Sequence, residues 1–144
     1  AKDVVNNLRD HAEKKNISLD YCGIPINIQG GRHVLYEMLY NIADNAVRYT
    51  NPGGHIHIYV GRKGNRPFYR VEDDGIGIPK SEQKRIFERF YRVDKSHSRE
   101  IGGTGLGLAI TRNAVLMHRG AIKAYSTEGE GTIFTVRIPL NYIA

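Results

Sequence analysis

The chain has 144 residues, of which 40% are hydrophobic and 25% are charged, a composition typical of one folded globular domain and not of a disordered chain. Its single cysteine, Cys22, excludes a disulfide framework and a cysteine-based zinc site. The apolar runs fall short of the roughly 20 residues that a membrane-spanning helix requires. The net charge of +6 favours an anionic partner such as a nucleotide phosphate, a nucleic acid or an acidic protein surface.

The first residues of the chain are predicted to be helical, because their apolar side chains fall on one stripe. The residues of that stripe are Val4, Val5, Leu8 and Ala12. The chain begins at Ala1 within this pattern, so we expect residues 1–16 to be the tail of a helix or linker from a preceding domain. Residues 17–144 then form the main domain.

The rest of the chain combines amphipathic helices with pairs of short strands. Alternation of apolar and polar residues predicts strands at 17–21, 26–28, 55–62, 67–73, 121–127 and 131–139. Helical spacing predicts helices at 32–49, 81–86 and 105–118. Because strand pairs separate the helices, we predict an α+β fold. The expected architecture is a two-layer α/β sandwich, in which about three helices cover one face of a mixed, mostly antiparallel sheet of about five strands.

The helix predicted at 32–49 carries a polar stripe. Asn41, Asn45 and Arg48 are spaced i, i+4 and i+7 and therefore point the same way. Asparagine is a mediocre residue inside a helix, so two on one face cost stability. An amide oxygen suits Mg²⁺, and a guanidinium group one turn further suits a phosphate. The stripe is also consistent with an ordinary solvated face of an amphipathic helix.

Two glycine-rich segments are candidate ligand loops. Asp73 ends a hydrophobic strand before Asp74-Gly75-Ile76-Gly77, so its carboxylate is placed to accept a hydrogen bond from a ligand amine. Residues 102–108, Gly-Gly-Thr-Gly-Leu-Gly-Leu, lead into a helix whose first N–H groups favour an anion. They lack the Lys-Ser/Thr ending of a P-loop and do not follow a strand of a βαβ unit. Each segment alone also fits a simple turn or hinge.

Two more segments have both a structural and a ligand-binding interpretation. In residues 87–92, Phe-Glu-Arg-Phe-Tyr-Arg, the aromatic and basic side chains suit base stacking or phosphate binding, although such residues more often anchor a loop to the core. Residues 129–132, Gly-Glu-Gly-Thr, lie between the last two predicted strands and are a hairpin turn first and a ligand contact second.

The order and spacing of these segments resemble the N, G1, F, G2 and G3 boxes of the catalytic ATP-binding domain of sensor histidine kinases, in the GHKL superfamily. The matching segments are residues 41–50, 73–79, 86–92, 102–108 and 129–132, in that order. The resemblance extends over about residues 17–140. It implies the GHKL ATP-binding fold, with ATP and Mg²⁺ as ligands.

The resemblance implies roles for individual residues on the phosphate side. Asn45 would ligate Mg²⁺ with Asn41 supporting the metal–phosphate cluster, and Arg48 takes the place usually held by lysine near the terminal phosphates. Arg92 would reach the γ-phosphate from a mobile lid at residues 91–104, so that Asn41, Arg48 and Arg92 are the candidate catalytic residues. The hinge and the phosphate contacts would come from Gly103, Thr104, Gly105, Leu106, Gly107 and Leu108.

On the base side, the resemblance implies that Asp73 accepts the adenine amino group. This carboxylate would select ATP over GTP, whose oxygen at that position would face an acceptor with no proton to share. Tyr49 would lie against the nucleotide. The adenine pocket would be shaped by Gly75, Gly77 and Ile78, and lined through a water molecule by Thr132.

The resemblance also implies partners. In this family the γ-phosphate passes to a histidine of a separate dimerisation domain, and later to an aspartate of a response regulator. None of the six histidines here lies in that phosphoacceptor motif, so the nucleophile is expected outside the chain. Phe87 and Phe90 are the expected docking residues for the dimerisation domain. We expect the domain to be a monomer that faces the cytoplasm, whether or not the parent kinase is anchored in the inner membrane. We expect neither a nucleic-acid partner nor direct membrane contact.

Three other functions stay open at this point. A GHKL ATPase, such as a chaperone, a type II topoisomerase subunit or a mismatch-repair protein, has a glutamate general base where this chain has Asn41, which cannot take a proton from water. An anti-sigma serine/threonine kinase shares the nucleotide pocket, but the F-box segment and the long lid favour a histidine kinase. A nucleic-acid binder would use the charge of +6, yet the basic residues are spread along the chain.

Overall fold

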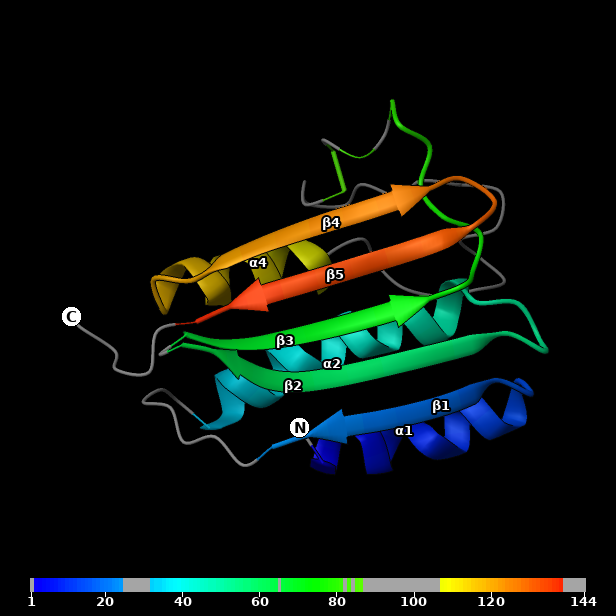
Figure 1. The fold of residues 1–144 in the computed structure, drawn as a ribbon, viewed down its shortest axis with the longest axis horizontal. Helices are drawn as coiled ribbons and strands as arrows, with labels where there is room; N and C mark the ends of the chain where they lie inside the picture. Colours follow the sequence, from blue (N-terminus) through cyan, green and yellow to red (C-terminus); the bar gives the residue numbers. More distant parts are fainter. Residues whose placement is uncertain are drawn as a thin grey trace.

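The computed structural model describes residues 2–24, 32–64, 66–81, 83, 85–86 and 107–138. The helices of this part of the chain are α1 (Lys2–Lys14), α2 (Arg32–Tyr49) and α4 (Gly107–Met117). Its strands are β1 (Ser18–Gly23), β2 (His55–Lys63), β3 (Arg66–Asp73), β4 (Ala121–Thr127) and β5 (Gly131–Arg137). Figure 1 shows all the labelled strands in one layer and all the labelled helices in a second layer behind it.

The strands form one mixed sheet of five, in the order β1-β2-β3-β5-β4. β1 runs parallel to β2, and the pairs β2–β3, β3–β5 and β4–β5 are antiparallel. The sheet is therefore mixed and mostly antiparallel, with helices on one face only. This arrangement confirms the predicted two-layer α+β sandwich.

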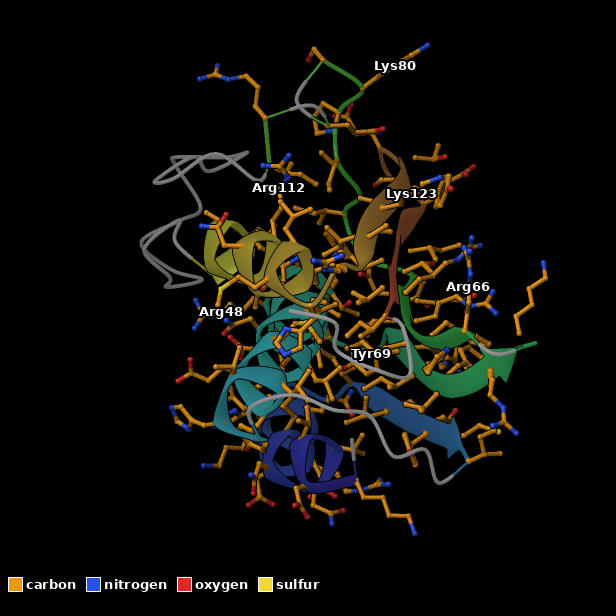
Figure 2. All side chains as sticks on the ribbon, turned by 90° about the vertical axis from the view of Figure 1, so that its left-hand side faces the viewer. Arg48, Arg66, Tyr69, Lys80, Arg112 and Lys123 are labelled. Carbon is orange, nitrogen blue, oxygen red and sulfur yellow. The ribbon has the colours of Figure 1, made fainter. Side chains whose placement is uncertain are left out.

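The core lies between the helices and the covered face of the sheet. Every second residue of the inner strands points into it, which is the period-2 burial expected of a half-covered sheet. Tyr69 lies in this layer (Figure 2), where its hydroxyl donates to the Leu39 carbonyl of α2 at 2.9 Å. The largest fully buried side chains are Phe134, Leu8, Met38, Ile42, Ile56, Ile58, Val4, Val5, Val71, Val115, Val136 and Thr50.

Helix α1 belongs to the same core as the rest of the fold. The predicted stripe of Val4, Val5, Leu8 and Ala12 is buried. The helix ends where Asn16 takes a left-handed conformation (φ 59°) and the Ile17 amide donates to the Ala12 carbonyl at 2.9 Å, which turns the chain into β1. Among the described helices, none combines the length and the apolar character that crossing a lipid bilayer requires.

Some predicted boundaries differ from the structure. The helix expected at 81–86 is wrong, because Ser81, Gln83, Arg85 and Ile86 lie in turns. This stretch is instead tied to β4, since the Gln83 side-chain amide donates to the Ser126 carbonyl at 2.9 Å. The strand expected at 26–28 lies outside the described residues.

Candidate functional site

The candidate site begins with a row of three residues across neighbouring strands. Asp73 at the end of β3 pairs with Thr132 at the start of β5, and Thr132 pairs with Ser126 near the end of β4. Thr132 and the buried Phe134 are two residues apart on β5, so their side chains point to the same face of the sheet. The row therefore lies on the face that the helices cover. The row thus places a carboxylate and two hydroxyls side by side at one edge of the sandwich.

The Asp73 carboxylate is held in place by main-chain donors. The Gly75 amide donates to its Oδ1 at 2.9 Å, and the Thr132 amide also donates to the carboxylate. Burial raises the pKa of Asp73 to about 6, although the two amides act in the opposite direction and Asp74 adds a smaller upward effect. A carboxylate has about four acceptor positions, so two amides leave Asp73 able to accept from a ligand donor.

Close main-chain contacts surround the loop that follows Asp73. A Cβ at Gly75 would lie 2.2 Å from the Tyr49 carbonyl oxygen, and one at Gly77 would lie 2.2 Å from the Thr127 carbonyl oxygen. Gly77 also has a φ of +71°, which side chains disfavour. The Ile76 amide donates to the Tyr49 carbonyl at 3.1 Å. The loop therefore passes between the end of α2 and the end of β4, and only glycine fits at positions 75 and 77.

A second set of hydrogen bonds attaches this loop to β4. The buried Ile78 donates its amide to the Ser126 hydroxyl at 2.7 Å. The Gln83 side-chain amide donates to the Ile78 carbonyl at 3.0 Å and also to the Ser126 carbonyl, and so links the two. Ser126 and Gln83 were not predicted from the sequence, because no motif marks them. The only signal was their position within the stretch between the recognised segments.

The polar stripe of α2 forms the other half of the candidate site. Asn41, Asn45 and Arg48 are all partly exposed, as the predicted stripe requires. Arg48 lies on the helical side of the molecule, whereas Arg66 and Lys123 lie toward the opposite side (Figure 2). Its Nε is 2.8 Å from Oδ2 of Asp44, one turn back on the same helix. The spacing i, i+4 is the signal that could have identified Asp44 as this partner.

The end of α2 is attached both to the Asp73 loop and to the segment after α1. Tyr49 is partly exposed and supplies the carbonyl to which the loop bonds. The Lys15 ammonium donates to the carbonyls of Val47 at 3.0 Å and Arg48 at 2.7 Å, and burial lowers its pKa. A cation at this position satisfies carbonyls that the helix leaves without partners. Lys15 was not predicted from the sequence, because it lies 32 residues from Val47 along the chain.

The structure thus brings together part of the predicted site. Asp73, Gly75, Gly77, Ile78 and Thr132 meet at the strand ends, and the last turn of α2, with Arg48 and Tyr49, adjoins them through the Tyr49 carbonyl. Gly107 begins α4, and Leu108 is packed against the core. The predicted residues that lie outside the described part of the chain are Phe87, Phe90, Arg92, Gly103, Thr104, Gly105 and Leu106.

Comparison with known proteins relates this arrangement to a family. Residues 30–142 match the family described as histidine kinase-, DNA gyrase B- and HSP90-like ATPase. The circadian input-output histidine kinase CikA of Synechococcus elongatus is 48% identical over 105 residues, which cover 73% of this chain and 14% of CikA. The catalytic domain of histidine kinase ThkA superposes with a TM-score of 0.83 at 25% identity, over 97% of this chain and 90% of that one. Full-length ShkA in complex with AMPPNP superposes with a TM-score of 0.83 at 27% identity, over 99% of this chain and 30% of that one.

The chain belongs to the family of histidine kinase-, DNA gyrase B- and HSP90-like ATPases. Within it, the fold and the relatives identify a catalytic ATP-binding domain of the sensor histidine kinase type, which confirms the resemblance seen in the sequence. The chain spans 14% of the length of CikA and 28% of the length of the Synechocystis sensor histidine kinase RppB.

Proposed function

We propose that this domain binds Mg-ATP and presents the γ-phosphate to a histidine carried by another part of a longer sensor kinase. The observation that carries the proposal is the partly buried Asp73 carboxylate, which has main-chain donors on one side and acceptor positions to spare. It is supported by the histidine kinase names of the relatives and by the AMPPNP bound to ShkA.

Asp73 is proposed to select the base. A carboxylate in this environment accepts from an exocyclic amine and repels a carbonyl oxygen, so adenine is favoured over guanine. Gly75 and Gly77 let the loop pack against the Tyr49 and Thr127 carbonyls, because a Cβ at either position would overlap that backbone, and this packing fixes the loop beside the carboxylate. Ile78 supplies a buried apolar contact, and Thr132 a hydroxyl next to the carboxylate. Tyr49 is proposed to lie against the nucleotide.

Asn41, Asn45 and Arg48 are proposed to face the triphosphate. The described residues contain no cluster of three or more histidine, cysteine or acidic side chains that would hold a metal alone. Two amide oxygens fit Mg²⁺, which keeps several waters and takes its other ligands from phosphates. Asn45 would hold the ion with Asn41 beside it, and when bound the ion neutralises charge on the phosphates. Arg48 would leave Asp44 to contact a phosphate oxygen.

Phosphoryl transfer in the whole kinase is then a matter of positioning and electrostatics. Arg92, with the glycine-rich segment 103–108, is proposed to complete the γ-phosphate contacts. Phe87 and Phe90 are proposed to dock the histidine-bearing dimerisation domain, and a response regulator receives the phosphoryl group afterwards. Phe90→Ala should leave ATP affinity unchanged and reduce autophosphorylation of the full kinase. Equal loss of both would contradict the docking role.

The nucleotide proposal is tested by calorimetric titration of the domain with ATP and with GTP in the presence of Mg²⁺. ATP should bind and GTP should not. Asp73→Asn should weaken ATP binding by about 10- to 100-fold, because hydrogen bonds to a charged group are worth about 1.5–3 kcal/mol. Asp74→Asn is the matched control, since Asp74 is exposed and bonds only His55 among the described residues. Equal affinity for ATP and GTP, or equal losses in the two variants, would contradict the proposal.

A further inference from the structure

We infer that Ser126 is a positioning residue for base selection, because its hydroxyl orients the Thr132 hydroxyl so that Thr132 only accepts hydrogen bonds on the side of the base. The inference rests on the proposed nucleotide site and deepens it. It concerns a residue of β4 that lies six positions before Thr132 in the chain and directly opposite it in the sheet.

The Ser126 hydroxyl has three polar neighbours. It accepts a hydrogen bond from the Ile78 amide at 2.7 Å and donates one to the Gly131 carbonyl at 2.9 Å. Its oxygen is also 2.8 Å from Oγ1 of Thr132. All three distances are those of normal hydrogen bonds. The pairing of β4 with β5 holds Ser126 and Thr132 directly opposite each other, so their side chains lie on the same face of the sheet.

Counting protons decides the direction of each bond. A serine hydroxyl has one proton and two lone pairs. The Ile78 amide can only donate, so it occupies one lone pair, and the Gly131 carbonyl can only accept, so it takes the proton. The remaining lone pair of Ser126 must therefore receive the proton of Thr132. The Thr132 proton is thereby committed to Ser126.

The consequence appears on the opposite side of Thr132, beside Asp73. With its proton committed, the Thr132 oxygen offers only lone pairs, and the Asp73 carboxylate likewise offers only acceptor positions. Asp73 and Thr132 are paired across β3 and β5, so together they present an edge without a donor. Such an edge matches an amine that meets it directly and rejects a carbonyl at the same place. Ser126 thus makes Thr132 a pure hydrogen-bond acceptor, like the Asp73 carboxylate beside it.

Ser126 also holds the loop at Ile78, so a specific role must be separated from a structural one. Gln83 offers the matched comparison, because its side-chain amide ties the same loop to β4 through the Ile78 and Ser126 carbonyls and not through the Thr132 hydroxyl. Ser126→Ala removes the loop contact and frees the Thr132 proton, whereas Gln83→Ala removes a loop contact alone. The ratio of affinities for two bases, which a general loosening would not change, distinguishes the two variants.

The experiment titrates the domain with Mg-ATP and with Mg-ITP, whose base carries an oxygen in place of the amine, at pH 8 so that Asp73 is ionised. Ser126→Ala should lower the ratio of ATP to ITP affinity about tenfold, because the freed Thr132 hydroxyl can turn and donate to the oxygen. Gln83→Ala should weaken both nucleotides equally. In a Thr132→Val background, Ser126→Ala should no longer change the ratio. Ser126→Thr, which keeps the hydroxyl, should retain the wild-type ratio.

Three results would overturn the inference. They are an unchanged ratio in Ser126→Ala, a fall of the same size in Gln83→Ala, and persistence of the Ser126→Ala effect in the Thr132→Val background. If Ser126→Ala does not fold, Ser126→Cys replaces the hydroxyl with a much weaker acceptor for the Thr132 proton and carries the same expectation. Failure of the wild-type domain to bind ATP would overturn the proposed function itself, and is therefore distinct from an unchanged ratio in a domain that binds.

Discussion

The strand-end half of the site and the α2 half are built differently. At the strand ends, the Gly75 and Thr132 amides hold the Asp73 carboxylate, and the Ser126 and Thr132 hydroxyls are hydrogen-bonded to each other. On α2, the cation that would meet a phosphate is paired with Asp44, a partner that it can exchange. Discrimination between bases needs fixed donors and acceptors, whereas a charged phosphate can be met by a side chain that changes partner.

The comparison predicts that the strand-end half tolerates backbone change least, which gives the largest expected effect. Gly77→Ala should reduce the free energy of unfolding by about 2–5 kcal/mol, from positive-φ strain together with overlap on the Thr127 carbonyl. Gly53→Ala is the matched control, because Gly53 has a φ of +89° and open space around it. It should lose only the strain, about 1–2 kcal/mol in denaturant unfolding. Equal losses would show that the contact with Thr127 is unimportant.

The second prediction concerns pH and is expected to change ATP affinity about tenfold. Asp73 has a pKa raised to about 6, and the carboxylate is the form that accepts from an amine, so ATP affinity should fall as the pH drops from 7.5 to 5. The reference is Asp73→Asn, which shares the titration of the nucleotide phosphates but lacks this carboxyl. Calorimetry in both proteins measures the difference, and parallel pH profiles would contradict the assignment to Asp73.

The same pKa has a consequence of opposite sign for stability. Because the folded pKa of Asp73 exceeds its ordinary value of 3.8, the folded protein binds more protons between these limits. This group therefore favours folding below about pH 4, and the contribution is lost as the pH rises through 6. Unfolding of the wild type and of Asp73→Asn across that range should show the difference.

Two smaller effects are expected on α2. Lys15→Met should lower the free energy of unfolding by about 1 kcal/mol, because the last carbonyls of α2 lose their donor. Lys14→Met removes an equal charge from an exposed position and should change stability little. Thermal unfolding at matched pH compares them, and a loss as large in Lys14→Met would mean that only the charge matters.

The smallest effect tests the exchangeable ion pair. Asp44→Ala should raise affinity for ATP about twofold and for ADP less, because Arg48 no longer has to leave a partner that is worth about 0.3–0.5 kcal/mol. Glu72→Ala is the control, since Glu72 pairs with Arg70 at 3.4 Å on the opposite face of the sheet. An identical gain in the control would attribute the effect to net charge.

Local patterns predicted much of this molecule. The α2 stripe followed from helical periodicity, and the strand that ends at Asp73 followed from alternation and from the glycines after it. These features depend on neighbours within a few residues, so spacing alone reveals them. The segment at 81–86 was predicted wrongly, because its described residues lie in turns and Gln83 bonds Ser126 of β4, 43 residues away, which a local pattern does not encode.

The sequence by itself determined the fold class, the family and the residues that are proposed to face a nucleotide. The tertiary structure decided how those residues are held. Ser126 lies opposite Thr132 only because β4 and β5 pair in this register, and it meets the Ile78 amide across 48 residues of chain. Lys15 meets the end of α2 only because α1 packs beside it in the core. Such contacts arise from strand register and helix packing, which local sequence patterns do not encode.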